Sequence, residues 1–165
     1  MKATLVIEGK EFPIEINDPE LQKIIAPPKK TGYELVGKGH TYSCVDSYGE
    51  VKTLDHQDQD DMNRFVDANY YSDRTVAENN VRADRLMRQL RRFAVENREK
   101  DIDWGNAVTP KWFICYEYEK LYCDFDQTFR TYNTIYFDSQ ELVERAIEVF
   151  HNELIWYFTE YKDSL

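Results

Sequence analysis

The sequence predicts an α+β protein in which antiparallel sheet packs on two long amphipathic helices. Two segments, residues 74–99 and 140–161, place apolar side chains at the i, i+3, i+4, i+7 spacing of a helix with one buried face. Shorter β-prone runs separated by turn residues precede each segment, as in β-hairpins. Apolar faces of sheet and helix bury each other, and this arrangement favours the α+β class.

Length and composition limit the classes to which the chain can belong. At 165 residues it has the size of one ordinary domain. Its 12 Tyr, 9 Phe and 3 Trp argue against disorder, and 6 Gly and 5 Pro exclude a collagen-like chain. No apolar run approaches the roughly 20 residues that cross a bilayer, and the first residues do not form a signal peptide. We therefore expect a cytoplasmic protein with no membrane partner.

The N-terminal residues predict a small appendage, at 1–31. Residues 3–16 contain two β-prone runs around Gly9, which indicates a hairpin. Asp18, followed by a proline, is typical of a helix N-terminus, and the proline at Pro27 stops that helix. The appendage is thus expected to have the order ββα.

The main α+β domain is expected to occupy residues 32–165. Its first half predicts two strands at 40–45 and 50–54, an acidic polar loop at 55–61 and a third strand at 65–71. A long helix then follows a polar cap. The second half shows the same order of hairpin, third strand and capped helix, at residues 112–118, 121–125, 134–137 and 140–161.

The shared order suggests a duplicated unit. In both halves a strand ends in an aromatic pair, a polar cap follows, and a long amphipathic helix begins. We interpret residues 33–99 and 112–162 as imperfect ββ-β-α pseudo-repeats. Convergence is the alternative, because strands commonly lead into helices in this way.

No motif in the sequence points to catalysis. The chain has no glycine-rich phosphate loop, no metalloprotease motif and no nucleophile elbow. Only three histidines could act as a base near neutral pH, and cysteine and histidine spacing does not indicate zinc. We therefore expect no enzymatic activity, no catalytic residues, no cofactor and no metal. An enzyme with an unfamiliar site is the alternative.

Charge is distributed unevenly along the chain. The net charge is −10, yet residues 74–98 hold seven Arg against three acidic residues, a local +4, which leaves −14 for the rest. Four arginines fall opposite the apolar stripe of this helix and should face solvent: Arg85, Arg88, Arg91 and Arg92. They could hold a nucleic-acid backbone or an acidic protein patch. They could equally form a salt-bridge surface with i,i+4 pairs Glu78–Arg82, Asp84–Arg88 and Arg92–Glu96.

Two further features are candidate contacts for a partner. The acidic segment supplies four carboxylates, Asp55, Asp58, Asp60 and Asp61, which could contact a basic protein or merely form a solvated loop. Trp156 falls off the main apolar stripe of the last helix. It could pack under the sheet, or it could anchor a homodimer or partner interface.

Four segments together carry a resemblance to known proteins: VDSYGEV at 45–51, NYYSD at 69–73, LRRFA at 90–94 and YFDSQEL at 136–142. Over about residues 33–160 the chain resembles a broad set of small proteins from phages, prophages and plasmids of Firmicutes. Some small acidic phage proteins of this type are anti-CRISPR inhibitors of type II effector nucleases, and the chain is similar to them in size and charge. The resemblance implies a phage accessory protein in the cytoplasm of a bacterial host.

These observations lead to two functional hypotheses. The first is a phage-encoded, non-enzymatic inhibitor whose acidity suits a basic nucleic-acid-handling protein, with a CRISPR effector nuclease as the specific partner. The second is an accessory or regulatory protein that binds nucleic acid through the arginine-rich helix.

Overall fold

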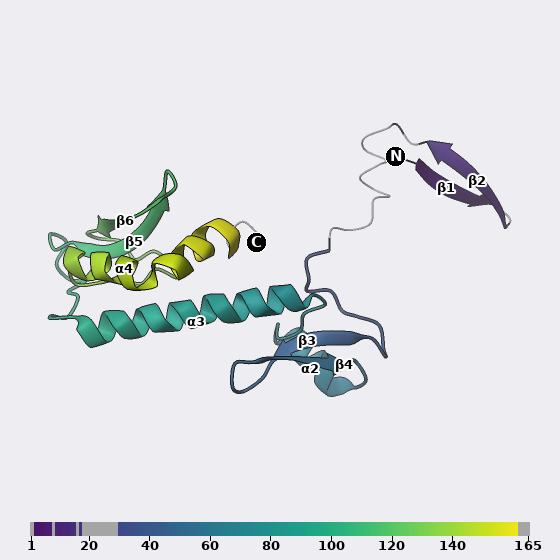
Figure 1. Cartoon of the computed structure of the whole chain (residues 1–165), viewed down its shortest axis with the longest axis horizontal. Helices are drawn as coiled ribbons and strands as arrows, with labels where there is room; N and C mark the ends of the chain where they lie inside the picture. The colour runs from purple at the N-terminus through teal and green to yellow at the C-terminus, as the bar shows by residue number, and fades with distance from the viewer. Residues whose placement is uncertain (1, 8, 16, 18–29, 162–165) are drawn as a thin grey trace.

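The computed structural model describes residues 2–7, 9–15, 17 and 30–161, and Figure 1 shows the arrangement of their elements. The described residues form six strands in three two-stranded antiparallel sheets, three α-helices and a short π-helix. The α+β class predicted from the sequence is confirmed. Among these helices, none is both long enough and apolar enough to cross a membrane.

The first sheet is the predicted N-terminal hairpin of strands β1 (Lys2–Ile7) and β2 (Lys10–Glu15). Gly9 lies in its turn with φ of +77°, a left-handed conformation that glycine adopts without steric cost. The helix predicted for the remainder of the appendage falls outside the described residues.

The second hairpin consists of β3 (Thr41–Val45) and β4 (Val51–Asp55), close to the predicted bounds. Asp46 organises the turn between them. One of its carboxylate oxygens accepts the backbone N–H groups of Tyr48 and Glu50, each at 2.9 Å. Such side-chain-to-backbone bonds are the reason that Asp favours turns, and here they fix the backbone of the hairpin tip.

The acidic loop predicted at 55–61 is wrong in its second part. Helix α2 (Gln59–Val66) begins there, with Asp58 as its N-cap. The Asp58 side chain accepts the N–H of Asp60, and Asp61 completes a capping box by accepting the Asp58 N–H at 3.0 Å. The same carboxylates that suggested a solvated loop thus satisfy the free amides of a helix N-terminus.

The third strands predicted for each half, at 65–71 and 134–137, are also wrong. Each shortens to one antiparallel bridge with the first strand of its hairpin, Tyr71 with Ser43 and Phe137 with Trp112. The sheets in the described residues therefore stay two-stranded, and the helices cover them instead of further strands.

The two long helices form as predicted. α3 (Arg74–Asn97) is capped by Asp73, and α4 (Gln140–Trp156) is capped by Ser139; both side chains accept N–H groups of the first helical turn. A π-helical turn, η1 (Tyr157–Tyr161), extends α4 to the end of the described residues. The third hairpin, β5 (Lys111–Glu117) with β6 (Lys120–Asp126), packs on α4.

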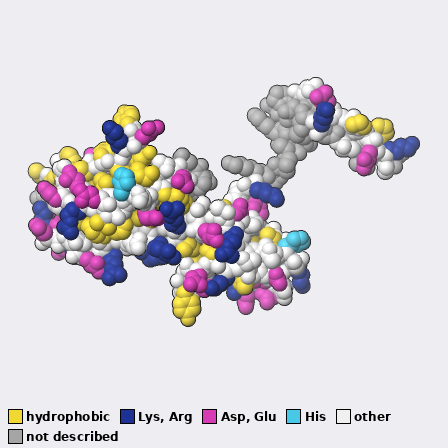
Figure 2. Space-filling model, in the orientation of Figure 1, with side chains coloured by type: hydrophobic (Ala, Val, Ile, Leu, Met, Phe, Trp, Pro, Cys, Tyr) yellow, Lys and Arg dark blue, Asp and Glu magenta, His cyan; other side chains and the backbone are white. Residues whose placement is uncertain are grey.

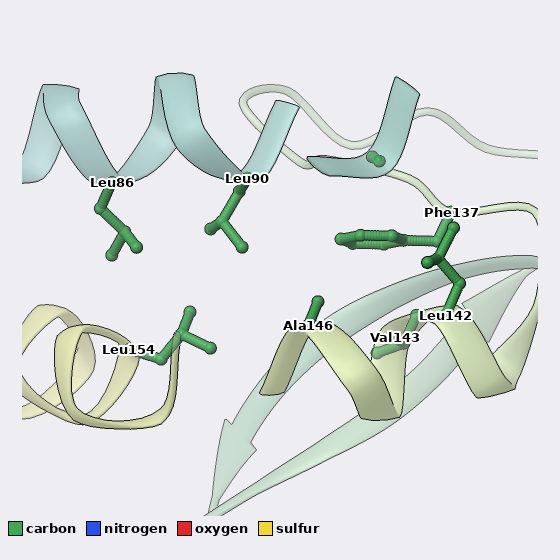
Figure 3. Close-up of a cluster of buried hydrophobic side chains, with 8 residues drawn as sticks. Leu86, Leu90, Phe137, Leu142, Val143, Ala146 and Leu154 are labelled. Carbon is green, nitrogen blue, oxygen red and sulfur yellow. The ribbon is translucent and has the colours of Figure 1, made fainter. Parts of the chain in front are cut away.

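The main core lies where the C-terminal part of α3 meets α4 and the third hairpin. Figure 3 shows side chains of α3 facing those of α4 across this layer, with Phe137 at one end. The buried members are Leu86, Leu90, Ala94, Phe137, Leu142, Val143, Ala146 and Leu154. A smaller cluster of Tyr42, Cys44 and Tyr70 holds the β3–β4 hairpin.

The structure gives both halves the same order of elements. In each, the bridging aromatic residue comes two positions before the helix cap: Tyr71 before Asp73, and Phe137 before Ser139. Helix α2 is present in the first half and has no counterpart in the second. The ββ-β-α pseudo-repeat stays a prediction, since the third strand of each half is a single bridge.

Candidate functional site

Helix α3 presents its arginines to solvent, as the sequence predicts. Leu86, Leu90 and Ala94 point into the main core and fix the rotation of the helix. The four arginines on the other side are exposed: Arg85, Arg88, Arg91 and Arg92, which we call the arginine face. Figure 2 shows basic side chains gathered where the lobe of α4, β5 and β6 meets the lobe of β3 and β4.

The β3–β4 hairpin stands on the same side of α3 as the arginine face. Its tip, at Gly49, lies between two grooves and lines both. The larger groove, of about 670 Å³, contains Arg85 together with parts of α3, β4 and α4. The smaller groove, of about 220 Å³, contains Arg88 with Asn69 and Asp84. The hairpin tip and α3 therefore meet at an angle, which we call the corner. Each of the two grooves beside it contains one arginine of the arginine face, Arg85 or Arg88.

The carboxylates of the larger groove are already occupied. Glu50 pairs with Lys52 at 2.6 Å, and Glu78 pairs with Arg74 at 2.7 Å. The third, Glu153, has a partner from α3, described below. Arg85 is the basic side chain of this lining that forms no ion pair with any described residue. Its guanidinium group thus keeps its hydrogen-bond donors free of described partners, although Glu153 lines the same groove.

Glu153 and Arg82 join α4 to α3. Two guanidinium N–H groups of Arg82 donate to the two carboxylate oxygens at 2.8 and 3.0 Å, a bidentate pair. This hydrogen bonding lowers the pKa of Glu153, and the nearby charge of Arg85 lowers it further. The predicted Glu78–Arg82 pair is therefore wrong, because each residue takes another partner.

The remaining arginines of the face differ in their pairing. Arg92 binds Glu96 at 2.7 Å, as predicted. The predicted Asp84–Arg88 pair is wrong, and neither Arg88 nor Arg91 forms an ion pair within the described part of the chain. Three guanidinium groups of the face, on Arg85, Arg88 and Arg91, consequently remain available to an external anion.

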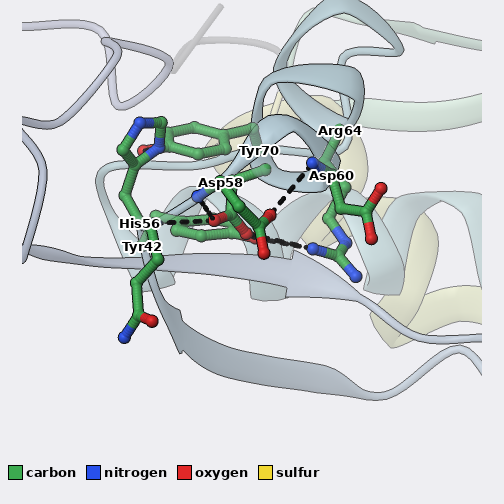
Figure 4. A network of polar contacts seen from close by, with 8 residues as sticks. Tyr42, His56, Asp58, Asp60, Arg64 and Tyr70 are labelled. Atoms are coloured by element: carbon green, nitrogen blue, oxygen red, sulfur yellow. Dashed lines mark hydrogen bonds and ion pairs between the residues drawn. The ribbon is translucent and has the colours of Figure 1, made fainter.

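Asp61, which the sequence suggested as a partner contact, is instead part of the interior. It is 5% exposed, and Figure 4 shows the polar network around it. Its carboxylate accepts the hydroxyl of Tyr42 at 2.5 Å, the N–H of Gln57 at 2.7 Å and the guanidinium of Arg64 at 3.1 Å. All these partners are internal, so Asp61 has no oxygen to offer to a basic protein.

The network shifts the pKa values of its members in opposite directions. Hydrogen bonds from the Gln57 amide and the Tyr42 hydroxyl hold the pKa of Asp61 well below its ordinary value. Burial and the hydrogen bond to Asp61 raise the pKa of Tyr42 to about 12. Both groups are thereby kept in one protonation state near neutral pH, which suits a structural role and not proton transfer.

The other three candidate carboxylates are exposed. Asp55 lies at the end of β4, and Asp58 and Asp60 lie at the start of α2. This end of the hairpin is opposite the tip that carries Gly49. The structure therefore does not bring the acidic and the arginine candidates into one site.

Trp156 is not available as an interface anchor. The side chain is 6% exposed because the guanidinium of Arg82 lies over its ring, 3.9 Å from the centroid, and Tyr161 packs beside it. The alternative expected from the sequence was packing under the sheet, whereas the contacts of the Trp156 ring are with Arg82 of α3 and with Tyr161. Arg82 and Trp156 are distant in sequence, so no local pattern could have indicated the contact.

Two buried charged residues were missed by sequence reasoning. Lys111 is fully buried and donates to the backbone carbonyls of Asn106 and Gln127, at 2.5 and 2.7 Å. Asp138 is also buried and accepts the N–H groups that follow α3, at 2.8 and 3.1 Å. Lys111 thus binds the loops on either side of its hairpin, and Asp138 binds the segment that follows α3. Within the described residues, no group of three or more His, Cys, Asp and Glu side chains could hold a metal ion.

Comparisons with known protein families, with curated proteins and with solved structures found no match to this chain. The functional argument therefore depends on the residues and their geometry.

Proposed function

We propose that the chain is an accessory protein that binds nucleic acid through the arginine face of α3. The observation that carries the proposal is the set of three exposed guanidinium groups, on Arg85, Arg88 and Arg91, that form no ion pair with any described carboxylate. Arginine donates in a planar fork that matches phosphate oxygens. Phosphate contacts of this kind supply most of the affinity in binding that does not depend on base sequence.

The arrangement of paired and unpaired arginines supports this reading over a plain salt-bridge surface. Arg74 and Arg82 are held by Glu78 and Glu153 and shape the walls of the larger groove. Arg85 lines the same groove without an ion pair to any described side chain. A surface that served only stability or solubility would gain more from pairing Arg85 as well.

The overall acidity of the chain limits where nucleic acid can bind. With −14 outside residues 74–98, the rest of the surface repels phosphate. The repulsion confines an anionic polymer to α3, and it should make binding strongly dependent on salt.

Binding can be measured by fluorescence anisotropy with labelled single- and double-stranded oligonucleotides at several salt concentrations. Replacing Arg85, Arg88 and Arg91 by Gln should weaken binding by about tenfold or more and flatten the slope of log K against log salt by about 2. The matched control replaces three exposed lysines that form no ion pair with any described residue, Lys38, Lys100 and Lys120, by Gln. If both variants lose affinity equally, only net charge matters, and the site is not on α3.

A second function is favoured by a different observation, the exposure of Asp55, Asp58 and Asp60 at the far end of the hairpin. These carboxylates suit a basic channel, so we also propose inhibition of a nucleic-acid-handling protein, with a type II CRISPR effector nuclease as the specific partner. The test is DNA cleavage by a purified nuclease with and without the chain. Inhibition that Asp55→Asn with Asp60→Asn removes, and that the arginine variant keeps, would favour this function.

A further inference from the structure

The tip of the β3–β4 hairpin carries an aromatic side chain next to the arginine face. Tyr48 is 89% exposed, and the following residue, Gly49, lines both grooves. Gly49 has φ of +79°, and its N–H donates to the carbonyl of Asp46 at 3.0 Å. Asp46 also binds the N–H groups on either side of Gly49. A rigid turn thus holds Tyr48 next to Gly49, the residue that lines the grooves containing Arg85 and Arg88, and the exposed ring itself lines neither groove.

The shape of this corner is unsuited to a helix that reads the major groove of a duplex. A helix that reads double-stranded DNA must enter the major groove, about 12 Å wide, and a helix with its side chains is itself about 10–12 Å across. α3 has α4 against one side, and on the other the tip of the hairpin reaches Val81 and the segment around Arg85 and Arg88 (Figure 1). The hairpin would meet the duplex before the helix could enter its groove.

A single strand suits the same corner. Sites for single-stranded nucleic acid combine a positively charged groove along the backbone with aromatic rings on which bases stack. Arg85 and Arg88 provide the charge on the two sides of the tip, and Tyr48 provides the ring. An exposed tyrosine at a turn needs no ligand by itself, but Tyr48 directly precedes Gly49, which lines both grooves, so a strand whose phosphates lie on the unpaired arginines passes close to the ring.

We infer that the arginine face binds single-stranded nucleic acid, with phosphates on Arg85 and Arg88 and a base stacked on Tyr48. The inference rests on the proposed function and adds the class of ligand and a base-contacting residue. It predicts little dependence on base sequence, because every base has a face that can stack.

The test uses the full chain and a labelled oligo-dT of about 12 nucleotides, within the range of single-strand site sizes, together with its duplex with oligo-dA. The single strand should bind at least about tenfold more tightly than the duplex at the same salt concentration. Tyr48→Ala should weaken oligo-dT binding by about fivefold to a hundredfold, whereas Tyr48→Phe, which keeps the ring, should bind like the wild type. Thermal unfolding of each variant checks that the fold is intact.

The outcomes separate this inference from the proposed function. Equal or tighter binding of the duplex, or an unchanged affinity of Tyr48→Ala, would overturn the single-strand inference while leaving nucleic-acid binding by the arginine face in place. The preference for single-stranded over duplex DNA is measured on the wild-type chain. It therefore tests the single-strand inference even if Tyr48→Ala alters the turn. Binding of neither oligonucleotide would overturn both proposals.

Discussion

The half of the chain built on β5, β6 and α4 is held by aliphatic and aromatic packing, whereas the half built on β3, β4 and α2 combines a small aromatic cluster with a polar network. In the former, Leu90, Phe137 and Leu154 belong to one continuous buried cluster. In the latter, the buried rings of Tyr42 and Tyr70 stack at 3.9 Å beside the ionised carboxylate of Asp61. Both halves have a hairpin followed by a long capped helix, but the interactions that stabilise them differ.

This difference assigns different tasks to the two halves. The apolar half packs against one side of α3 and contains most of the larger of the two buried clusters. The polar half is small, and it positions a rigid hairpin tip against the exposed side of α3, where the unpaired arginines lie. Stability and binding should therefore respond to different substitutions.

The largest expected loss of stability comes from a substitution in the apolar core. Leu90→Ala should lower the free energy of unfolding by about 3–5 kcal/mol, because it removes a buried side chain and leaves a cavity. Leu54→Ala, at a half-buried position packed on the smaller cluster, should cost well under that amount. Urea denaturation of both variants measures the difference. Equal losses would show that the two clusters contribute alike.

The next effect concerns the polar network. Tyr42→Phe keeps the ring but removes the hydroxyl that donates to Asp61, which should cost about 1–2 kcal/mol of unfolding free energy. Tyr48→Phe is the matched control, because that hydroxyl belongs to an exposed ring. Chemical denaturation would contradict the account if both variants were equally stable.

The pH dependence of stability should also report on the network. The pKa of Asp61 is lowered in the folded chain, so its contribution is fully present above its unfolded pKa of about 4 and is lost as the pH falls below that value. Asp61→Asn should therefore unfold at a lower temperature than the wild type at pH 6, and the gap should narrow towards pH 2. Glu34, whose pKa is lowered to about 2 by Ser72 and the Thr31 amide, is unchanged in both proteins and so does not affect the gap. A gap that is constant with pH would contradict the assignment.

How far the sequence could predict these features depends on how far apart in the sequence the residues that form each feature lie. A polar cap before each long helix, both long helices and the exposure of the arginine face follow from local spacing and were predicted, and the structure assigns the caps to Asp73 and Ser139. α2 was missed although its signal is local: Asp58 and Asp61 have the spacing of a capping box. Burial of Trp156 under Arg82 depends on the packing of α3 against α4, which no local pattern encodes.

The smallest expected loss of stability distinguishes the arginines of α3 that form an ion pair from those that do not. Arg82→Gln should lower the free energy of unfolding by about 0.5–1 kcal/mol, because it removes a bidentate ion pair and the contact with the Trp156 ring. Arg85→Gln should leave stability unchanged within error. Thermal and chemical unfolding of the two variants, measured side by side, provides the comparison. A loss for Arg85→Gln equal to that for Arg82→Gln would mean that Arg85 also supports the fold.

The central claim is that the unpaired arginines bind nucleic acid while the paired arginines hold the structure. The most direct test follows the side-chain Nε–Hε signals of the arginines by NMR during titration with oligo-dT. We expect the signals of Arg85 and Arg88 to shift progressively, while those of Arg74 and Arg82 stay in place. Shifts confined to Arg74 and Arg82, or no shift at any arginine of α3, would contradict the claim.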